Sequence, residues 1–409
     1  MEQLRHLTPA RDRNFQKGEH GAMKIIFNRD DLIYATRTVS SIVQPQTALP
    51  ILGNILIRAE GDTVIFRTSD LESSITCSIN ARVEVEGVIT VPAVPFANMV
   101  REFPGEEISI AIEEDDKVVI RSERDFCQLQ TMNPSEFPAW SDIASATTFN
   151  ISEKDLRYMI SKIIFAIPTK DPRKVLLGSL LCVDTDFPEY LDVTDVEAPV
   201  HLRMVATDGK KLSYVDCAGS GLQGKVPTKA IVHFKILSEL LKMLGDEGAV
   251  TVGIGERQIS FKFGKTEFKT NMIEGEFPNY EMVVPREFTI NIPLQKSTFL
   301  NAVRRAAIVS DMRSNTIIFK FHPGEVMIEA SSFDLGSFSG TLPLDYEGET
   351  FALSLSHKYL QEVLHVIDAE EITLHIKNPS LPLIFHVKDT RNPLYLLMPI
   401  RVAQPSEQG

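Results

Sequence analysis

One pattern of predicted elements occurs three times along this chain, and it restricts the possible folds more than any other feature. Each copy has a helix-like stretch, a strand-turn unit, a second helix behind a proline, and then two strands. Leu32, Leu156 and Leu300 occupy the same place in the three copies. Because these positions lie a domain's length apart, the repeat unit is a domain and not a short solenoid repeat. A chain of three equivalent domains suggests a symmetric assembly.

The repeat also sets the expected domain boundaries. We predict three domains at 23–145, 146–286 and 287–402, with a disordered extension at 1–22 and a tail at 403–409. The copies open at 23–32, 147–156 and 288–300, their second helices are predicted at 91–103, 226–244 and 353–367, and their last strands at 126–138, 268–278 and 394–402.

The periodicity of apolar residues predicts the layers within each domain. Leu32, Ala35 and Val39 follow the spacing of a helix with one buried face, and the other five helix candidates behave similarly. The segments 108–122 and 250–263 alternate as strands do. We therefore expect an α+β fold in which each domain packs two helices on antiparallel sheet.

Composition excludes several classes of protein. No apolar run approaches the roughly 20 residues of a membrane helix. The nine histidines are dispersed, so neither a metal site nor a cofactor is expected. The four cysteines, with no C-x-x-C pair, fit a reducing cytoplasm, and they are Cys77, Cys127, Cys182 and Cys217.

The charge distribution is more informative than the net charge of −13. Acidic residues crowd into strand and loop stretches such as 105–116 and 183–197. Cations are expected on the exposed faces of the six helices, so the chain can be acidic overall and still carry one basic surface. These cations are Arg37, Arg101, Lys154, Arg157, Lys162, Lys229, Lys235, Lys242, Lys296, Arg304, Arg305 and Lys358.

Motifs for nucleotide binding and catalysis are missing. There is no phosphate loop, and GSFSG (336–340) has Phe338 where a nucleophile elbow needs serine. Three equivalent turns each carry an acid: Asp70, Asp208 and Asp334. One reading makes the chain a multi-domain enzyme that uses Asp208, with nearby lysines, on a phosphorylated substrate. The other makes the aspartates turn residues that bind their own backbone, and their recurrence favours this second reading.

Five segments together resemble a known family, the bacterial sliding clamps, which are beta subunits of DNA polymerase III. The similarity covers residues 23–402. The segments are TALPILGNILI (47–57), TSDLE (68–72), VATDGKKL (205–212), GEFPNYEMVVP (275–285) and YLLMPIRV (395–402).

The resemblance implies a non-enzymatic processivity factor. Two chains of three domains would close head to tail into a ring around duplex DNA, with the helices lining the hole. The implied partners are the replicative DNA polymerase, the clamp loader and other proteins that carry a short Gln-Leu-type motif. No membrane partner is implied.

The family's functional positions can be carried over one by one. The dimer contact is expected between Cys127 and Leu129 of one chain and Ile308 and Val309 of the other. DNA-binding positions of the family fall on Gln46, Lys170, Arg173 and Lys174, and the helix-face cations Arg101, Lys229, Lys235 and Arg304 are also expected to contact DNA. The peptide-binding groove falls on Leu176, Leu177, Thr207, Gly209, Lys210, Lys211, Leu212, Pro278, Val283, Leu355, Ser356, Leu396, Met398, Pro399, Ile400 and Arg401.

Overall fold

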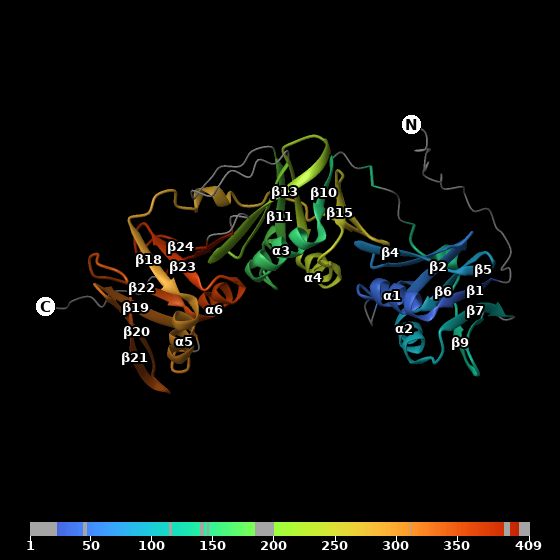
Figure 1. Ribbon diagram of the computed structural model, residues 1–409, viewed down its shortest axis with the longest axis horizontal. Coiled ribbons are helices and arrows are strands. Elements are labelled where there is room, and N and C mark those ends of the chain that lie inside the picture. The colour runs from blue at the N-terminus through green and yellow to red at the C-terminus, as the bar shows by residue number, and fades with distance from the viewer. Residues whose placement is uncertain are drawn as a thin grey trace. The chain divides into compact units, whose positions relative to one another are not determined.

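The computed structural model contains two compact units, one ending at Trp140 and one beginning at Ser141 (Figure 1). Unit 1 holds the first repeat, and unit 2 holds the second and third. The structure describes residues 23–43, 47–113, 117–139, 143–144, 147–184, 200–311, 313–387 and 393–400.

Unit 1 packs two helices against two antiparallel sheets. Asn28 begins the first helix, because its side-chain oxygen accepts hydrogen bonds from the N–H groups of Asp30 and Asp31. One sheet has the order β5-β1-β7-β8-β9, and the other contains β4, β3, β2 and β6 in that order. The elements are β1 Lys24–Asn28, α1 Arg29–Ser40, β2 Asn54–Glu60, β3 Thr63–Ser69, β4 Ser73–Asn80, β5 Arg82–Val85, β6 Gly87–Pro92, α2 Ala93–Glu102, β7 Glu107–Glu113, β8 Lys117–Ser122 and β9 Asp125–Gln130.

The first half of unit 2 repeats this arrangement. Ser152 begins its first helix by accepting from the N–H of Asp155. A long strand, β13, pairs with β12 along most of its length and with β10 near its end. The elements are β10 Thr147–Ser152, α3 Glu153–Ile163, β11 Gly178–Asp184, β12 Val200–Thr207, β13 Lys211–Gly224, β14 Thr228–His233, α4 Phe234–Met243, β15 Ala249–Ile254, β16 Gln258–Phe263 and β17 Thr266–Asn271.

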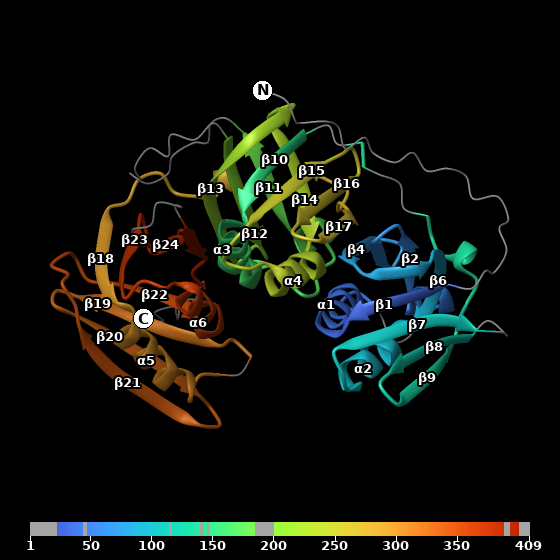
Figure 2. The same cartoon turned by 45° about the vertical axis from the view of Figure 1, so that its right-hand side comes forward.

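The second half of unit 2 is the third copy. Its four-stranded sheet has the order β21-β20-β19-β22, while β18, β23, β24 and β25 form the other sheet. The helices α5 and α6 lie side by side against these sheets (Figure 2). The elements are β18 Ile290–Gln295, α5 Lys296–Ala307, β19 Thr316–His322, β20 Glu325–Ser332, β21 Gly336–Pro343, β22 Phe351–Ser356, α6 His357–Val366, β23 Glu371–Ile376, β24 Leu383–His386 and β25 Leu394–Leu397.

One strand pairing joins the two halves of unit 2. Leu212 of β13 lies opposite Leu396 of β25, so the sheet runs on from the second copy into the third. A cluster of buried side chains that includes Leu176, Leu212 and Leu396 fills the space beneath this seam. The seam is therefore both a backbone ladder and a core.

The predicted α+β domains with two helices each are confirmed, but the second helices were predicted to begin too early. Residues 226–233 are mostly strand β14, and only Phe234–Met243 is helical. The same holds for β6 before α2 and for β22 before α6. A short apolar run fits the helical and the strand periods equally well, so periodicity alone could not place this boundary.

Candidate functional site: a surface at the seam of unit 2

The turn between β12 and β13 is fixed by its own side chains. Asp208 Oδ1 accepts from the N–H groups of Lys210 at 2.8 Å and Lys211 at 2.9 Å. Thr207 Oγ1 donates to the carbonyl of Lys211 at 2.8 Å. Gly209 has a φ of +88°, a conformation that side chains rarely adopt. Asp208 is thus occupied with backbone, as a turn residue.

The equivalent turns show how far this role repeats. Asp70 Oδ1 accepts from the N–H groups of Glu72 and Ser73 in the same way. In the third copy the serine takes over, since Ser332 Oγ accepts from the N–H of Leu335. The structural reading therefore holds for two of the three aspartates, and Asp334 departs from it.

The chain after β25 passes beside this turn. The N–H of Met398 donates to the carbonyl of Lys210 at 2.8 Å, and the N–H of Ile400 donates to the carbonyl of Ser354 at 2.8 Å. Two strand ends that are remote in sequence are thereby held together. We call the result the Met398 surface, made of Leu176, Leu177, the turn 207–212, Val283 and residues 396–400.

The Met398 surface has an apolar floor and exposed apolar side chains above it. Leu176, Leu212 and Leu396 are buried in the cluster under the seam. Met398 and Val283 are 39% and 45% exposed, which is high for side chains of this type. Apolar groups near water beside polar turn groups are what a short peptide needs to anchor and orient itself.

Arg173 forms one rim of this surface. Its Nε lies 2.9 Å from Asp171 Oδ1, and its second amino group lies 2.9 Å from Asp171 Oδ2 and 3.1 Å from the carbonyl of Asp208. The hydrogen bonds from the Arg173 guanidinium and backbone N–H lower the pKa of Asp171 to about 2. Sequence reasoning missed this pairing, although an acid two residues before an arginine was visible in KDPRK.

Lys211 links the turn to the third copy. It is 6% exposed, and its Nζ hydrogen-bonds the carboxylate of Glu362 on α6. The nitrogen also lies near the rings of Phe165 and Tyr359, at 5.5 and 5.0 Å from their centroids. A lysine held in this way is not available to a phosphorylated substrate, so the geometry does not favour the enzyme reading.

The predicted groove residues fall into four groups. Pro278 is exposed in a segment whose neighbours Phe277, Tyr280 and Val284 pack on the same cluster. Leu355 lies instead in the core of the third copy, and Ser356 precedes α6. Arg401 lies outside the described residues. The seam cluster and the turn bring together Leu176, Thr207, Gly209, Lys210, Lys211, Leu212, Leu396, Met398, Pro399 and Ile400, and Leu177 and Val283 are sequence neighbours of the cluster residues Leu176 and Val284.

Two of the predicted surface cations are placed differently. Lys162 is 5% exposed, and its Nζ lies 2.6 Å from both Asp368 Oδ2 and the carbonyl of Val366. The prediction that Lys162 lies on an exposed helix face is therefore wrong. The side chain lies at the junction with the third copy, where Val366 and Asp368 contact it.

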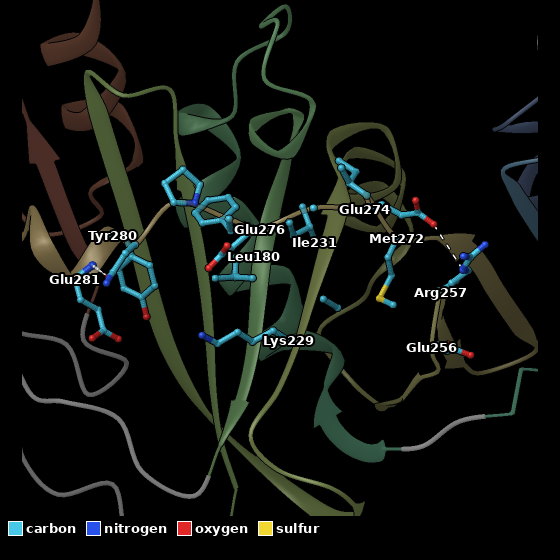
Figure 3. Close-up of a pocket in the computed structure, with 16 residues that line it drawn as sticks. Leu180, Lys229, Ile231, Glu256, Arg257, Met272, Glu274, Glu276, Tyr280 and Glu281 are labelled. Atoms are coloured by element: carbon cyan, nitrogen blue, oxygen red, sulfur yellow. Dashed lines mark hydrogen bonds and ion pairs between the residues drawn. The ribbon is translucent and has the colours of Figure 1, made fainter.

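Lys229 was also predicted on a helix but lies on strand β14. It lines a pocket of about 700 Å³ together with Tyr280 and the acids Glu276 and Glu281 (Figure 3). Negative charge around a lysine weakens its attraction for phosphate. Lys229 thus loses the helical setting on which its assignment to DNA rested.

The other predicted DNA-binding residues differ in exposure. Lys170, Arg173 and Lys174 are exposed around the short helix Lys174–Leu177. Arg101 is exposed beside Glu102, and an Arg304 amino group lies 2.9 Å from His365 Nε2. Lys235 is half-buried at the start of α4, and Gln46 lies outside the described residues.

The predicted dimer residues lie at strand and helix ends. Cys127 and Leu129 are on β9, the last strand of its sheet. Ile308 follows α5 and is 73% exposed. Phe126, on the same strand as Cys127, is 62% exposed and was not singled out from the sequence. An aromatic residue in an alternating strand was the available signal.

Comparison with known proteins identifies one family along residues 23–401. Models of the DNA polymerase III beta subunit match in order: the N-terminal domain at 23–141, the central domain at 150–279 and the C-terminal domain at 281–401. The beta sliding clamp of Caulobacter vibrioides (strain NA1000 / CB15N) is 30% identical over 386 residues, covering 93% of this chain and 100% of the relative. The chain belongs to the DNA polymerase III beta subunit family, the beta sliding clamps.

Further relatives and solved structures extend the match. The beta sliding clamp of Chlamydia pneumoniae is 26% identical over 380 residues, with 93% of this chain and 99% of the relative covered. A Pseudomonas aeruginosa sliding clamp bound to griselimycin has a TM-score of 0.86 at 26% identity, covering 93% of this chain and 100% of that one. A Caulobacter crescentus clamp gives 0.84 at 28%, with the same coverage.

Family membership settles the function at the level of the whole chain. The protein is a DNA sliding clamp, a processivity factor of DNA polymerase III, and the alternative reading as an enzyme acting through Asp208 is not supported. Within the described ranges, no group of three or more metal-binding side chains comes together. The longest apolar helices there fall short of what crossing a bilayer requires.

Proposed function

We propose that two copies of the chain close head to tail into a ring. Ile308 exposes most of its side chain at the end of α5, and β9 carries exposed Phe126 at a sheet edge. Exposed apolar strand edges favour pairing with another chain, which removes them from water. The observation that carries the proposal is the exposure of two apolar side chains on a three-domain clamp chain, Ile308 at the end of α5 and Phe126 on the edge strand β9.

Light scattering tests the ring. A particle of twice 45.8 kDa is expected at micromolar concentration, and Ile308→Asp should shift it to the monomer because a buried charge opposes the contact. Leu381→Asp, at an exposed turn position, is the matched control and should stay dimeric. A wild-type monomer under these conditions would contradict the proposal.

Duplex DNA is the proposed content of the ring. Arg101, Lys170, Lys174 and Arg304 are exposed cations that can meet phosphates without reading bases. Such contacts weaken with salt, and enclosure can retain the DNA while each contact stays weak. Lys235, at the start of α4, remains a candidate for contact with DNA, whereas the structure gives no support for Lys229 as a DNA contact.

Retention on DNA distinguishes enclosure from ordinary binding. Loaded protein should remain on closed circular DNA at high salt and be lost when that DNA is linearised. The double change Lys170→Ala and Lys174→Ala should lower direct binding and leave the dimer intact. Arg173 is left unchanged, because it holds the Met398 surface. Equal retention on circular and linear DNA would argue against enclosure.

The Met398 surface is proposed to bind the short Gln-Leu-type motifs of the replicative polymerase, the clamp loader and other partners. A leucine or aromatic anchor buried against Met398 and Val283 is worth roughly 1.5–3 kcal/mol. Polar groups of the turn can orient the peptide. After the cost of ordering a flexible tail, micromolar affinity is expected. Titration calorimetry with a Gln-Leu peptide should give about one site per chain.

We also propose that the chain has no catalytic activity of its own and works in the cytoplasm. Asp208 and Lys211 are engaged with backbone and with Glu362, and all four cysteines are thiols, as in reducing compartments. A purified sample should not turn over phosphorylated substrates above the level of an Asp208→Asn variant. Cell fractionation checks the location.

A further inference from the structure

A pocket of about 700 Å³ lies on the second copy, between strands β11 and β14 and the segment 272–281 that follows β17 (Figure 3). Backbone hydrogen bonds hold this segment in place. The N–H of Ile273 donates to the carbonyl of Ile231 at 2.9 Å, and the N–H of Met272 donates to the carbonyl of Arg257 at 2.8 Å. The pocket is therefore built into the fold of the second copy.

The floor of the pocket is apolar. Leu180 and Ile231 are buried there, and Phe277 joins them from the segment 272–281. Met272 and Ile273 are only partly buried, so an incoming apolar side chain can cover them and remove them from water. Such a floor gives a ligand an anchor but does not orient it.

The rim of the pocket is charged. Arg257 Nε lies 3.6 Å from Glu274 Oε1, so these two charges largely offset each other. The carboxylates of Glu256, Glu276 and Glu281 also line the pocket, and they form no ion pair with any residue that the structure describes. The rim therefore carries an excess of negative charge.

The acidic groups lie on both sides of the apolar floor. In Figure 3, Glu281 and Glu256 are at opposite ends of the row of lining side chains, with Ile231 between them. Negative charge at both ends repels phosphates and attracts cations that flank an apolar group. Within the described ranges, these carboxylates do not gather into a group that could hold a metal ion. The chemistry of the pocket thus favours an extended basic peptide.

We propose that this pocket binds a short basic segment of a partner protein, in which lysines or arginines flank one apolar side chain. The apolar side chain packs on Met272 and Ile273, and the cations pair with Glu276 and Glu281. Lys229 is exposed in the same pocket and opposes these cations, so it limits the affinity. The site is additional to the Met398 surface and to the Gln-Leu motif proposed to bind there.

The pocket and the Met398 surface share one stretch of chain. Val283 of the Met398 surface closely follows Glu281 of the pocket. Gly275 has a φ of +128°, and a Cβ at this position would lie 2.7 Å from Val175, the residue before Leu176. The two sites nevertheless use different side chains, so one partner can occupy both at once. Two linked contacts of this kind hold a partner more tightly than either contact alone.

A labelled peptide tests the site. The probe is fluorescein-labelled Lys-Lys-Leu-Lys-Lys, titrated with the full chain at low salt and followed by fluorescence anisotropy, and about one site per chain is expected. Glu276→Gln together with Glu281→Gln should weaken binding about fivefold or more, because two charge pairs are lost. Lys229→Gln should instead tighten binding, since it removes a repulsive charge.

A matched double variant controls for overall charge. Glu347→Gln with Glu349→Gln makes the same change in net charge at two exposed positions of the third copy, and it should leave the affinity unchanged. A probe with glycine in place of leucine should bind more weakly, because it lacks the apolar anchor. Equal losses in the two double variants would show that the probe senses only the net charge of −13, which overturns the proposal.

Competition separates the pocket from the Met398 surface. An unlabelled Gln-Leu peptide should not displace the probe, and Met398→Asp should not weaken probe binding. Displacement by that peptide would place the probe on the Met398 surface and overturn the pocket assignment. Displacement by spermidine as effective as that by unlabelled probe would mean that the rim takes any polycation, which overturns the peptide assignment. No probe binding at about millimolar concentration, with Gln-Leu binding intact, overturns the pocket and leaves the proposed function standing.

Discussion

Arg203 and Asp216 face each other directly across β12 and β13 and form a two-pronged ion pair. Arg203 Nε lies 2.6 Å from Asp216 Oδ1, and a second nitrogen lies 2.7 Å from Oδ2. Arg203 is 1% exposed, and its guanidinium lies 4.5 Å from the centre of the Tyr214 ring. Burial alone lowers the pKa of Arg203, but the hydrogen bonds and charge of Asp216 outweigh it and keep the arginine charged.

This pair predicts a large loss of stability when one partner is removed. Asp216→Ala leaves a buried guanidinium without its carboxylate and should lower the free energy of unfolding of unit 2 by about 3–5 kcal/mol. Urea denaturation measures the change. Asp246→Ala, which removes an exposed ion pair with Arg157, should cost under about 1 kcal/mol. Similar losses in both variants would mean that burial does not set the effect.

The Met398 surface predicts a variant in which partner binding and assembly separate. Met398→Asp puts a charge where an apolar anchor should bind and should reduce Gln-Leu peptide affinity by a factor of ten or more. Calorimetry and light scattering on one sample should show lost binding with an unchanged dimer. Undiminished affinity in this variant would place the peptide site elsewhere.

Cysteine accessibility gives a prediction that needs no mutation. Cys77, Cys182 and Cys217 are buried, and burial raises the pKa of the Cys182 thiol to about 11. Cys127 on β9 is partly exposed and should react first with a maleimide. Because the proposed ring covers β9, labelling should slow as protein concentration rises into the dimer range. Mass spectrometry of the labelled peptide reports both effects, and a rate independent of concentration would count against coverage of this strand.

A pair of histidines predicts a stability change with pH. Burial, with a contribution from the neighbouring His386, lowers the pKa of His375 to about 4 from its usual 6.5. The unfolded chain therefore binds a proton more readily than the folded one between these values. Stability should be unaffected by this group above pH 6.5 and should fall as the pH drops from 6.5 to 4. Across this window the melting temperature of the wild type should fall more steeply with decreasing pH than that of His375→Gln. The same pH dependence in both proteins would mean that His375 is not the cause.

Most of the architecture could be predicted from the sequence, because the same pattern of elements occurs in it three times. Leu32, Leu156 and Leu300 predicted helices that exist, and all three are buried. The boundaries of the second helices were not readable, since residues such as 228–233 satisfy both periods until sheet partners are known. Pairing with β11 decides that these residues are a strand.

Only those site residues whose contacts are made with sequence neighbours could be predicted correctly. Asp208 as a turn residue follows from its neighbours, and the hydrogen bonds confirm it. Lys162 could not be foreseen as buried, because its partner Asp368 is remote in sequence. Exposure of a helical lysine depends on what packs against that helix, and periodicity records only that the helix has an apolar face.

The two surfaces of the proposed contact between copies, the end of α5 and strand β9, have a consequence for symmetry. They are different surfaces, so each contact between copies is heterologous, and nothing in such a contact by itself limits how many copies can join. A heterologous contact closes only if the turn from one subunit to the next completes a circle; otherwise it extends into a filament. For a two-membered ring each chain must supply half a turn. A substitution that changes the bend within one chain, far from both surfaces, should therefore change closed particles into open polymers while every contact between copies stays intact.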